Sequence, residues 1–317
     1  MIRLSKKFLI ALLLIGCILS LGCNSNLRAE QKTHTSAYDS NTEKLFIGEK
    51  QSGSLLECNF YDEREFNLFD IQSEPYDVEN EIWCGVVPHH LLAGKMIASF
   101  FKTASENRQN EIDTVVIIAP IHEPKSNKIC TTLSDWEAPT GTLSTDKGLS
   151  EKFVTKLNAA EDDEMLQSDH SASGLIPFVK YYFPSASVSC LLVSRTADDD
   201  TPERVSELLA EFSKEKSCLF VFSVDFSHYL NPDEAANHDD ETLKAVMDND
   251  LESISKMGNS NMDSPYCVST FLRLNDISDG QVQTLDHSNS FEILGLPYTH
   301  PSFNDGVTSY FIFAGIR

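Results

Sequence analysis

Short, mostly apolar runs alternate with amphipathic segments along most of the chain. This pattern predicts strands at Thr114–Ala119, Lys128–Leu133, Val188–Val193, Cys218–Val224 and Val307–Ile316. It predicts helices at Leu91–Ala104, Leu149–Leu157, Ala172–Phe183, Pro202–Lys214, Asp233–Met247 and Leu251–Met257. Strands that alternate with helices indicate an α/β fold. We therefore expect a single three-layer domain in which helices flank a central, mostly parallel or mixed sheet.

The N-terminal residues do not fit this pattern. Three basic residues precede an apolar stretch that is too short to span a membrane comfortably and ends in SLGC at Cys23. A small residue directly before a cysteine at the end of such a stretch is similar to a bacterial lipobox, in which that cysteine is lipid-modified. We therefore expect residues 1–23 to be a lipoprotein signal peptide. LIGC at Cys17 also fits, and an ordinary signal peptide or an uncleaved anchor is the alternative.

The rest of the chain divides by composition. Residues 24–43 are polar and are expected to form a flexible tether. Residues 44–80 are expected to be an N-terminal extension that packs on the domain edge as two or three short strands or an irregular layer. Residues 81–317 are expected to form the α/β domain. A lipid on Cys23 would anchor this domain to the cell membrane on its exported side, periplasmic or extracellular.

The chain is strongly acidic. Its 48 acidic residues outnumber its 25 basic ones, so the formal net charge is −23. A field of this sign repels the phosphates of nucleic acids and anionic membrane surfaces. The charge therefore argues against a nucleic-acid-binding protein.

Histidines occur where predicted strands end. His89 follows the apolar run GVVP, His122 follows VVIIAP and one further residue, and LFVFSV runs into Asp225 and His228. The carboxyl ends of parallel strands meet at one edge of an open sheet, where α/β proteins bind ligands. We therefore expect these three histidines on one rim, with His170 in SDHSASG as a further candidate. The histidines without such a context are expected to be structural or exposed: His34, His238, His287 and His300.

One cysteine differs from the others. The chain has no CxxC pair, and Cys84, Cys190 and Cys218 lie in or beside apolar runs, where cysteine is usually a small buried hydrophobic residue. Cys267 instead precedes the helical pattern VSTFLRL. This position predicts a sulfur at a helix N-terminus, where the thiolate is favoured.

Seven segments between Ile82 and Arg317 together resemble a known family. In chain order they are VPHH, IIAPIHEP, WEAPTGTLSTD, SDHSASGLIPFVKYYFP, VFSVDFSHY, SPYCVSTFL and DGVTSYFIFAGI. This order is similar to the MEMO family, which includes AmmeMemoRadiSam system protein B and is related in fold to class III extradiol dioxygenases of the LigB type. The chain departs from the family's common pattern in having PHHLL instead of PHAGY, PIHEP instead of a paired histidine, and Val268 instead of glycine after the cysteine.

The resemblance implies a metal site formed by His89, His122 and Cys267. It implies that His228 carries protons beside the metal, that Asp225 belongs to the same motif, and that His170 matches the histidine before the long helix. Two imidazoles and a thiolate suit a transition metal, iron or copper in the first place and zinc as a possibility. We expect Asp225 to orient the site or to be a weak extra ligand, and His228 to titrate near neutrality.

These expectations leave several functions open. One is a metal-dependent oxidoreductase that acts on a small molecule, and an extradiol-type iron enzyme is a variant of it. Another is a non-catalytic module that binds a metal or a peptide. A third is a hydrolase with Cys267 as nucleophile and His228 as base, although no nucleophile elbow is present. The family association implies AMMECR1-like and radical SAM proteins as partners, although an exported, lipid-anchored protein could not easily meet cytoplasmic partners.

The lipobox-like sequence generates the first prediction. Replacing Cys23 with Ser should release the protein from the membrane fraction, because several acyl chains on this cysteine would provide the stable anchor. Fractionation and metabolic lipid labelling measure the effect. Unchanged labelling of both the Cys23→Ser and the Cys17→Ser variants would refute lipid anchoring.

Overall fold

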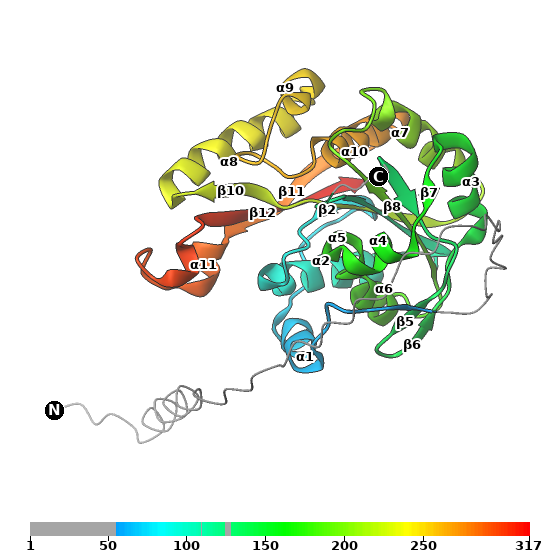
Figure 1. The fold of residues 1–317 in the computed structure, drawn as a ribbon, viewed down its shortest axis with the longest axis horizontal. Helices are drawn as coiled ribbons and strands as arrows, with labels where there is room; N and C mark the ends of the chain where they lie inside the picture. Colours follow the sequence, from blue (N-terminus) through cyan, green and yellow to red (C-terminus); the bar gives the residue numbers. More distant parts are fainter. Residues whose placement is uncertain (1–54, 109, 124–127) are drawn as a thin grey trace, which may run out of the picture. The chain divides into compact units, whose positions relative to one another are not determined.

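The computed structural model describes residues 55–108, 110–123 and 128–317 (Figure 1). The predicted signal peptide, with Cys17 and Cys23, and the predicted tether lie outside these residues, as does His34. Within the described part, no helix combines the length and the apolar character needed to cross a membrane.

Four parallel strands form the centre of the main sheet. They are β2 (Ile82–Val87), β9 (Cys218–Ser223), β3 (Thr114–Pro120) and β8 (Ser187–Val193), adjacent in this order. Every residue of β2, β3 and β9 is buried. Continuous apolar runs form such strands because both faces of a parallel sheet are covered. The predicted α/β fold is therefore confirmed.

Antiparallel strands extend this centre on both sides. Next to β2 lies β12 (Val307–Ile316), which pairs with β10 (Phe226–Leu230) and β11 (Gln281–Asn289). Next to β8 lie β4 (Ile129–Thr131) and β7 (Ala160–Glu161). The described residues thus contain a mixed nine-stranded sheet. A small separate sheet contains β1 (Leu56–Glu57), β5 (Trp136–Ala138) and β6 (Gly141–Leu143).

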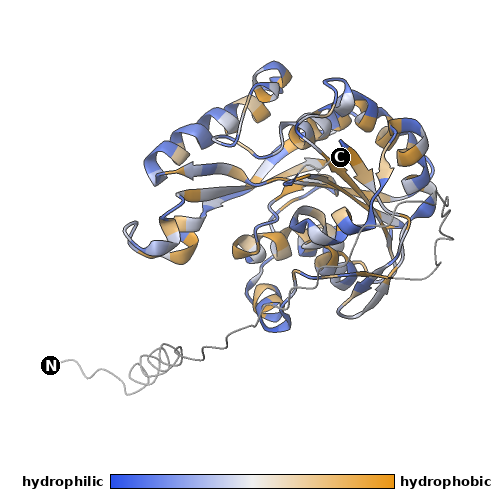
Figure 2. Cartoon of the chain, in the orientation of Figure 1, coloured by the Kyte–Doolittle hydropathy of each residue, from blue (hydrophilic) through white to orange (hydrophobic). Residues whose placement is uncertain are grey.

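Helices cover both faces of the main sheet (Figure 1). One face, with Val115 and Ile117 of β3, packs on α2, α4, α5 and α6, and the other, with Val116 and Ile118, packs on α3, α7, α9 and α10. Figure 2 shows apolar strands between helices whose outer faces are polar. The helices are α1 (Glu63–Gln72), η1 (Leu91–Ala93), α2 (Gly94–Glu106), α3 (Lys147–Leu157), α4 (Asp163–Ser168), α5 (His170–Ser173), α6 (Ile176–Tyr182), α7 (Thr201–Phe212), α8 (Pro232–Met247), α9 (Leu251–Ser255), α10 (Pro265–Ile277), α11 (Ser290–Leu294) and η2 (Pro301–Phe303).

Two local expectations were wrong. The segment before β2 was expected to form short strands or an irregular layer. Residues 63–72 instead form the helix α1, because the Asp62 side chain caps its first amides and Phe66 packs into the core. The helix expected at residues 172–183 is divided into α5 and α6. Gly174 and Leu175 separate the two, and Pro177 lies in the first turn of α6.

Substitution of Gly85 in β2 would test how closely the sheet packs against α2. A Cβ atom at Gly85 would lie 2.3 Å from the Phe100 ring and 2.8 Å from the carbonyl oxygen of Phe313. Gly85→Ala should therefore lower the free energy of unfolding by about 2 kcal/mol or more through overpacking. Urea denaturation measures this loss. Gly258→Ala is the control, because a Cβ there meets no atom within 4 Å; equal stability of the two variants would contradict the packing.

Candidate metal centre

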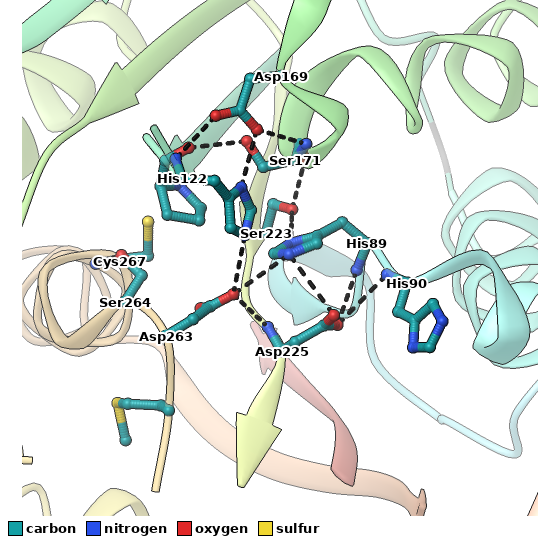
Figure 3. A network of polar contacts seen from close by, with 12 residues as sticks. His89, His90, His122, Asp169, Ser171, Ser223, Asp225, Asp263, Ser264 and Cys267 are labelled. Carbon is teal, nitrogen blue, oxygen red and sulfur yellow. Dashed lines mark hydrogen bonds and ion pairs between the residues drawn. The ribbon is translucent and has the colours of Figure 1, made fainter. Parts of the chain in front are cut away.

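The parallel strands deliver their polar residues to one rim, as predicted for His89 and His122. β2 ends two residues before His89, β3 ends two residues before His122, and β9 ends two residues before Asp225. The ring centroids of the two histidines lie 5.0 Å apart (Figure 3). Residues from three neighbouring strands therefore face one small volume.

A chain of hydrogen bonds fixes the proton of the His89 ring. Its Nδ1 lies 2.8 Å from the hydroxyl of Ser223, and that hydroxyl donates to the carbonyl oxygen of Ser171 at 2.6 Å. A hydroxyl has only one proton to donate, so the Ser223 oxygen must accept from Nδ1. Nδ1 of this buried ring is therefore protonated, and Nε2 is the atom presented to the site.

Asp169 fixes the ring of His122 in the way that Ser223 fixes the ring of His89, with Nδ1 hydrogen-bonded and Nε2 facing the site. Its Oδ1 lies 2.9 Å from His122 Nδ1, and its Oδ2 accepts the backbone N–H of His122 at 2.8 Å. The backbone N–H of Ser171 also donates to Oδ1, at 3.0 Å. A carboxylate accepts hydrogen bonds only, so His122 Nδ1 is the donor and Nε2 again faces the site.

Both Nε2 atoms face the carboxylate of Asp263 (Figure 3). Oδ2 of Asp263 lies 3.2 Å from Nε2 of His89 and 3.8 Å from Nε2 of His122. Oδ1 of Asp263 is buried and has no hydrogen-bond partner among the described residues. Asp225 adds a second carboxylate, whose Oδ2 lies 3.5 Å from Nε2 of His89.

Backbone contacts hold these two carboxylates in place. The N–H of Asp225 donates to Oδ2 of Asp263 at 3.3 Å, and the N–H groups of His89 and His90 donate to Oδ1 of Asp225 at 3.1 and 3.4 Å. Arg195, which follows β8, donates through Nε to the carbonyl oxygen of Asp263 at 2.7 Å. The loop that carries Asp263 is thereby tied to the fourth parallel strand.

His170 completes a group of three imidazoles. It is the first residue of α5, and its ring stacks on His122 with centroids 4.4 Å apart and lies 5.1 Å from the ring of His89. Among the residues that the structure describes, two sets have ligand atoms within 4.8 Å of one another: His89, His122 and His170, and His89, Asp225 and Asp263. The nitrogen and oxygen atoms at the rim are therefore close enough together to bind one metal ion.

Cys267 lies at the start of α10, as predicted, and its backbone N–H donates to the capping hydroxyl of Ser264 at 3.3 Å. Its side chain is completely buried, and Sγ donates to the carbonyl oxygen of Ile118 at 3.6 Å. Burial raises the pKa of this thiol. The expected thiolate is thus not favoured by the protein alone, because desolvation outweighs the helix N-terminus.

His228 lies on β10, and its Nδ1 is buried without a hydrogen-bond partner among the described residues. Burial lowers its pKa, and the nearby carboxylates of Asp263 and Asp225 oppose this shift. The imidazole is therefore neutral at pH 7, which is the form that accepts a proton.

The same contacts set the pKa values of the other three imidazoles at the rim. Burial alone would lower the pKa of His122, but its hydrogen bonds to Asp169 and Asp263 raise that pKa to about 10. Burial likewise acts against a charged His89, but Asp225 and Asp263 raise the pKa of its ring. Burial and the neighbouring His89 and His122 lower the pKa of His170 to about 4. The carboxylates thus favour positive charge at the two inward-facing nitrogens.

This rim lies inside the segment that a known family shares. The profile of the family described as Memo-like protein matches residues 63–297. The chain belongs to the Memo-like protein family. The resemblance inferred from the seven sequence segments is therefore confirmed.

Curated relatives are described as MEMO1 family proteins. A MEMO1 family protein of Methanosarcina acetivorans is 27% identical over 178 residues, which cover 55% of this chain and 64% of that protein. One of Methanococcoides burtonii is 29% identical over 193 residues, covering 60% and 69%. The match thus spans less than two thirds of the first relative. An uncharacterized protein of Escherichia coli K12 with a crystal structure aligns at a TM-score of 0.47 and 13% identity, over 74% of this chain and 99% of that one.

Sequence reasoning missed three residues of this Memo-like site. Asp169 directly precedes the candidate His170, and Asp263 directly precedes Ser264, which caps the helix of the candidate Cys267. The sequence therefore could have indicated both aspartates through their position beside a candidate residue. Ser223 gave no signal, because it is one polar residue in an apolar strand. His287 is structural, as expected: its Nε2 lies 2.9 Å from the buried Asp239, and its ring stacks on Phe311.

The raised pKa of His122 predicts how stability depends on pH in the metal-free protein. The pKa rises from 6.5 to about 10 on folding, so the stabilisation is complete below about 6.5 and is lost as the pH rises towards 10. Denaturation at pH 6.5 and pH 10 should show this loss, and His122→Ala should reduce it. A His300→Ala variant is the control, since the ring is exposed and its hydrogen bonds within the described part of the chain go to Ser302. A loss of equal size in the His122 variant would contradict the assignment.

Proposed function

We propose that this Memo-like protein binds a catalytic transition metal ion, iron or copper in the first place, through Nε2 of His89 and Nε2 of His122. The observation that carries the proposal is that both Nδ1 atoms are hydrogen-bonded while both Nε2 atoms face the same buried carboxylate. Metal-binding histidines are usually held in this way by a partner on the other ring nitrogen.

The third ligand in this proposal is the carboxylate of Asp263. It fits a cation because Oδ1 has no partner although it is buried, and a buried unpaired carboxylate oxygen is costly. Two imidazoles and one carboxylate form the set that non-haem iron proteins use. The thiol of Cys267 is the second candidate, which the sequence pattern supports. A thiolate there would favour copper or zinc instead.

The surrounding residues suit proton transfer on a small molecule. A bound iron or copper ion would supply positive charge and one-electron chemistry at the rim. His228 would accept or donate the proton, since its neutral ring has a free Nδ1. Asp225 would hold the His89 backbone, and His170 would cover the face of His122. The side chain of His122 is 31% exposed, which gives a substrate access from solvent.

A non-catalytic metal-binding module is the alternative function, and oxygen consumption with catechol-type substrates distinguishes it from an extradiol-type enzyme. The hydrolase hypothesis loses its support, because a buried neutral thiol is a poor nucleophile.

We also propose an exported, lipid-anchored location. AMMECR1-like and radical SAM proteins are candidate partners by family association only, and an exported, lipid-anchored protein would not easily meet cytoplasmic partners. Co-purification from membranes would test them.

Metal analysis of single variants tests the site. His89→Ala and His122→Ala should each remove stoichiometric metal from the purified full chain, whereas His228→Ala should retain it and lose any turnover. Inductively coupled plasma mass spectrometry measures the metal, and circular dichroism checks the fold. His287→Ala is the matched control, because it removes an imidazole outside the rim. Full metal content in both the His89 and the His122 variant would refute the site.

A second pair of variants identifies the third ligand. Asp263→Asn should lower metal affinity by at least about tenfold if the carboxylate binds the ion, and Cys267→Ser should then have little effect. The reverse result would assign the thiolate. A sulfur-to-metal charge-transfer band that disappears in Cys267→Ser would give the same answer independently of affinity.

A further inference from the structure

A hollow lies in the helical layer formed by α7, α9 and α10. It has a volume of about 450 Å³ and is formed by the start of α7, α9 and one face of α10. No histidine of the rim lines it. Volumes of this size are typical of sites for small molecules.

The lining face of α10 consists of Tyr266, Ser269 and Arg273, which follow one another at helical spacing. The opposite face, with Cys267 and Phe271, is buried in the core. The phenol of Tyr266 donates to the carbonyl oxygen of Ala197 at 2.7 Å and so fixes its ring as a wall. The α10 side of the hollow is therefore built on a rigid element.

Two opposite charges line the hollow without pairing. Arg273 is half-buried, and Asp199 lies near the start of α7. Neither side chain forms a hydrogen bond or an ion pair of 4 Å or less within the described residues. Arg204, by contrast, contacts Asp200 and the carbonyl oxygen of Lys156. In a chain with a net charge of −23, a half-buried guanidinium without a carboxylate partner is a notable feature.

Apolar side chains lie among these charges. Pro202, Leu251 and Pro265 contribute to the walls. A dianion such as phosphate would be repelled by Asp199. Glu252 also lines the hollow, but its carboxylate accepts a hydrogen bond from the Lys256 ammonium group at 2.6 Å. A molecule with one carboxylate, one ammonium group and a short apolar part matches all three features.

We propose that this hollow binds a small zwitterion of the size of an amino acid or a dipeptide. Its carboxylate pairs with Arg273, which can form two parallel hydrogen bonds to it. Its ammonium group faces Asp199. Because Asp199 is exposed, its contribution to affinity is the smaller one.

Isothermal titration calorimetry of the full chain with the twenty free amino acids and a set of alanyl dipeptides tests the proposal. At least one should bind, and Arg273→Gln should weaken it by at least about tenfold, with partial recovery in Arg273→Lys. Asp199→Asn should weaken it about threefold and should remove the preference over the N-acetylated compound. Arg204→Gln is the matched control and should bind as the unmodified chain does.

Two results would overturn the proposal: no binding by any compound of the panel, or unchanged affinity in Arg273→Gln. Thermal denaturation of each variant shows whether it is folded. If Arg273→Gln does not fold, the affinity of Arg273→Lys tests the proposal in its place. Metal content should be the same in all of these variants. Failure here is therefore distinguishable from failure of the proposed metal site.

Discussion

The site depends on the parallel pairing of β2, β9 and β3. Neighbouring strands lie about 4.8 Å apart, and the register aligns Val87 with Ser223 and Ile118 with Phe222. This pairing places His89, Asp225 and His122 beside one another although they are distant in sequence. Apolar clusters on both faces of the sheet hold the strands in register. Because this apolar burial provides most of the stability of the fold, the rim can accept polar and charged residues.

A short segment around α5 controls both imidazoles. Asp169 holds Nδ1 of His122, and the carbonyl oxygen of Ser171 holds the hydroxyl that contacts Nδ1 of His89. The hydroxyl of Ser171 also donates to the carbonyl oxygen of Pro120 at 2.8 Å, which ties the segment to the end of β3. The two rings are thus oriented by one piece of backbone, and a shift of α5 would move both.

α10 links the two proposed sites. Its first turn follows Asp263, its inner face carries Cys267 into the core, and its outer face lines the hollow with Arg273. The two sites differ in chemistry. The rim concentrates carboxylates around imidazoles, which suits a cation. The hollow is lined by Arg273 and Asp199, which form no ion pair with any residue that the structure describes.

The sequence by itself determined the elements whose signal is local. The apolar runs identified β3, β8, β9 and β12, because strands that are buried on both faces of a sheet require continuous apolar residues. The seven segments identified the family. The apolar runs also placed His89 and His122 on one rim, since strand ends of a parallel sheet share an edge. The polar strand β11 carried no such signal, because its pairing with β12 depends on backbone hydrogen bonds and not on its side chains.

Only the tertiary structure decided which groups contact one another. Asp263 and Asp169 reach the histidines from loops that the sequence separates from them, and Ser223 fixes a ring proton through a contact with Ser171. The buried state of the Cys267 thiol likewise follows from packing against β3. Distances, burial and the resulting pKa values depend on the packed structure, so a pattern along the chain does not contain them.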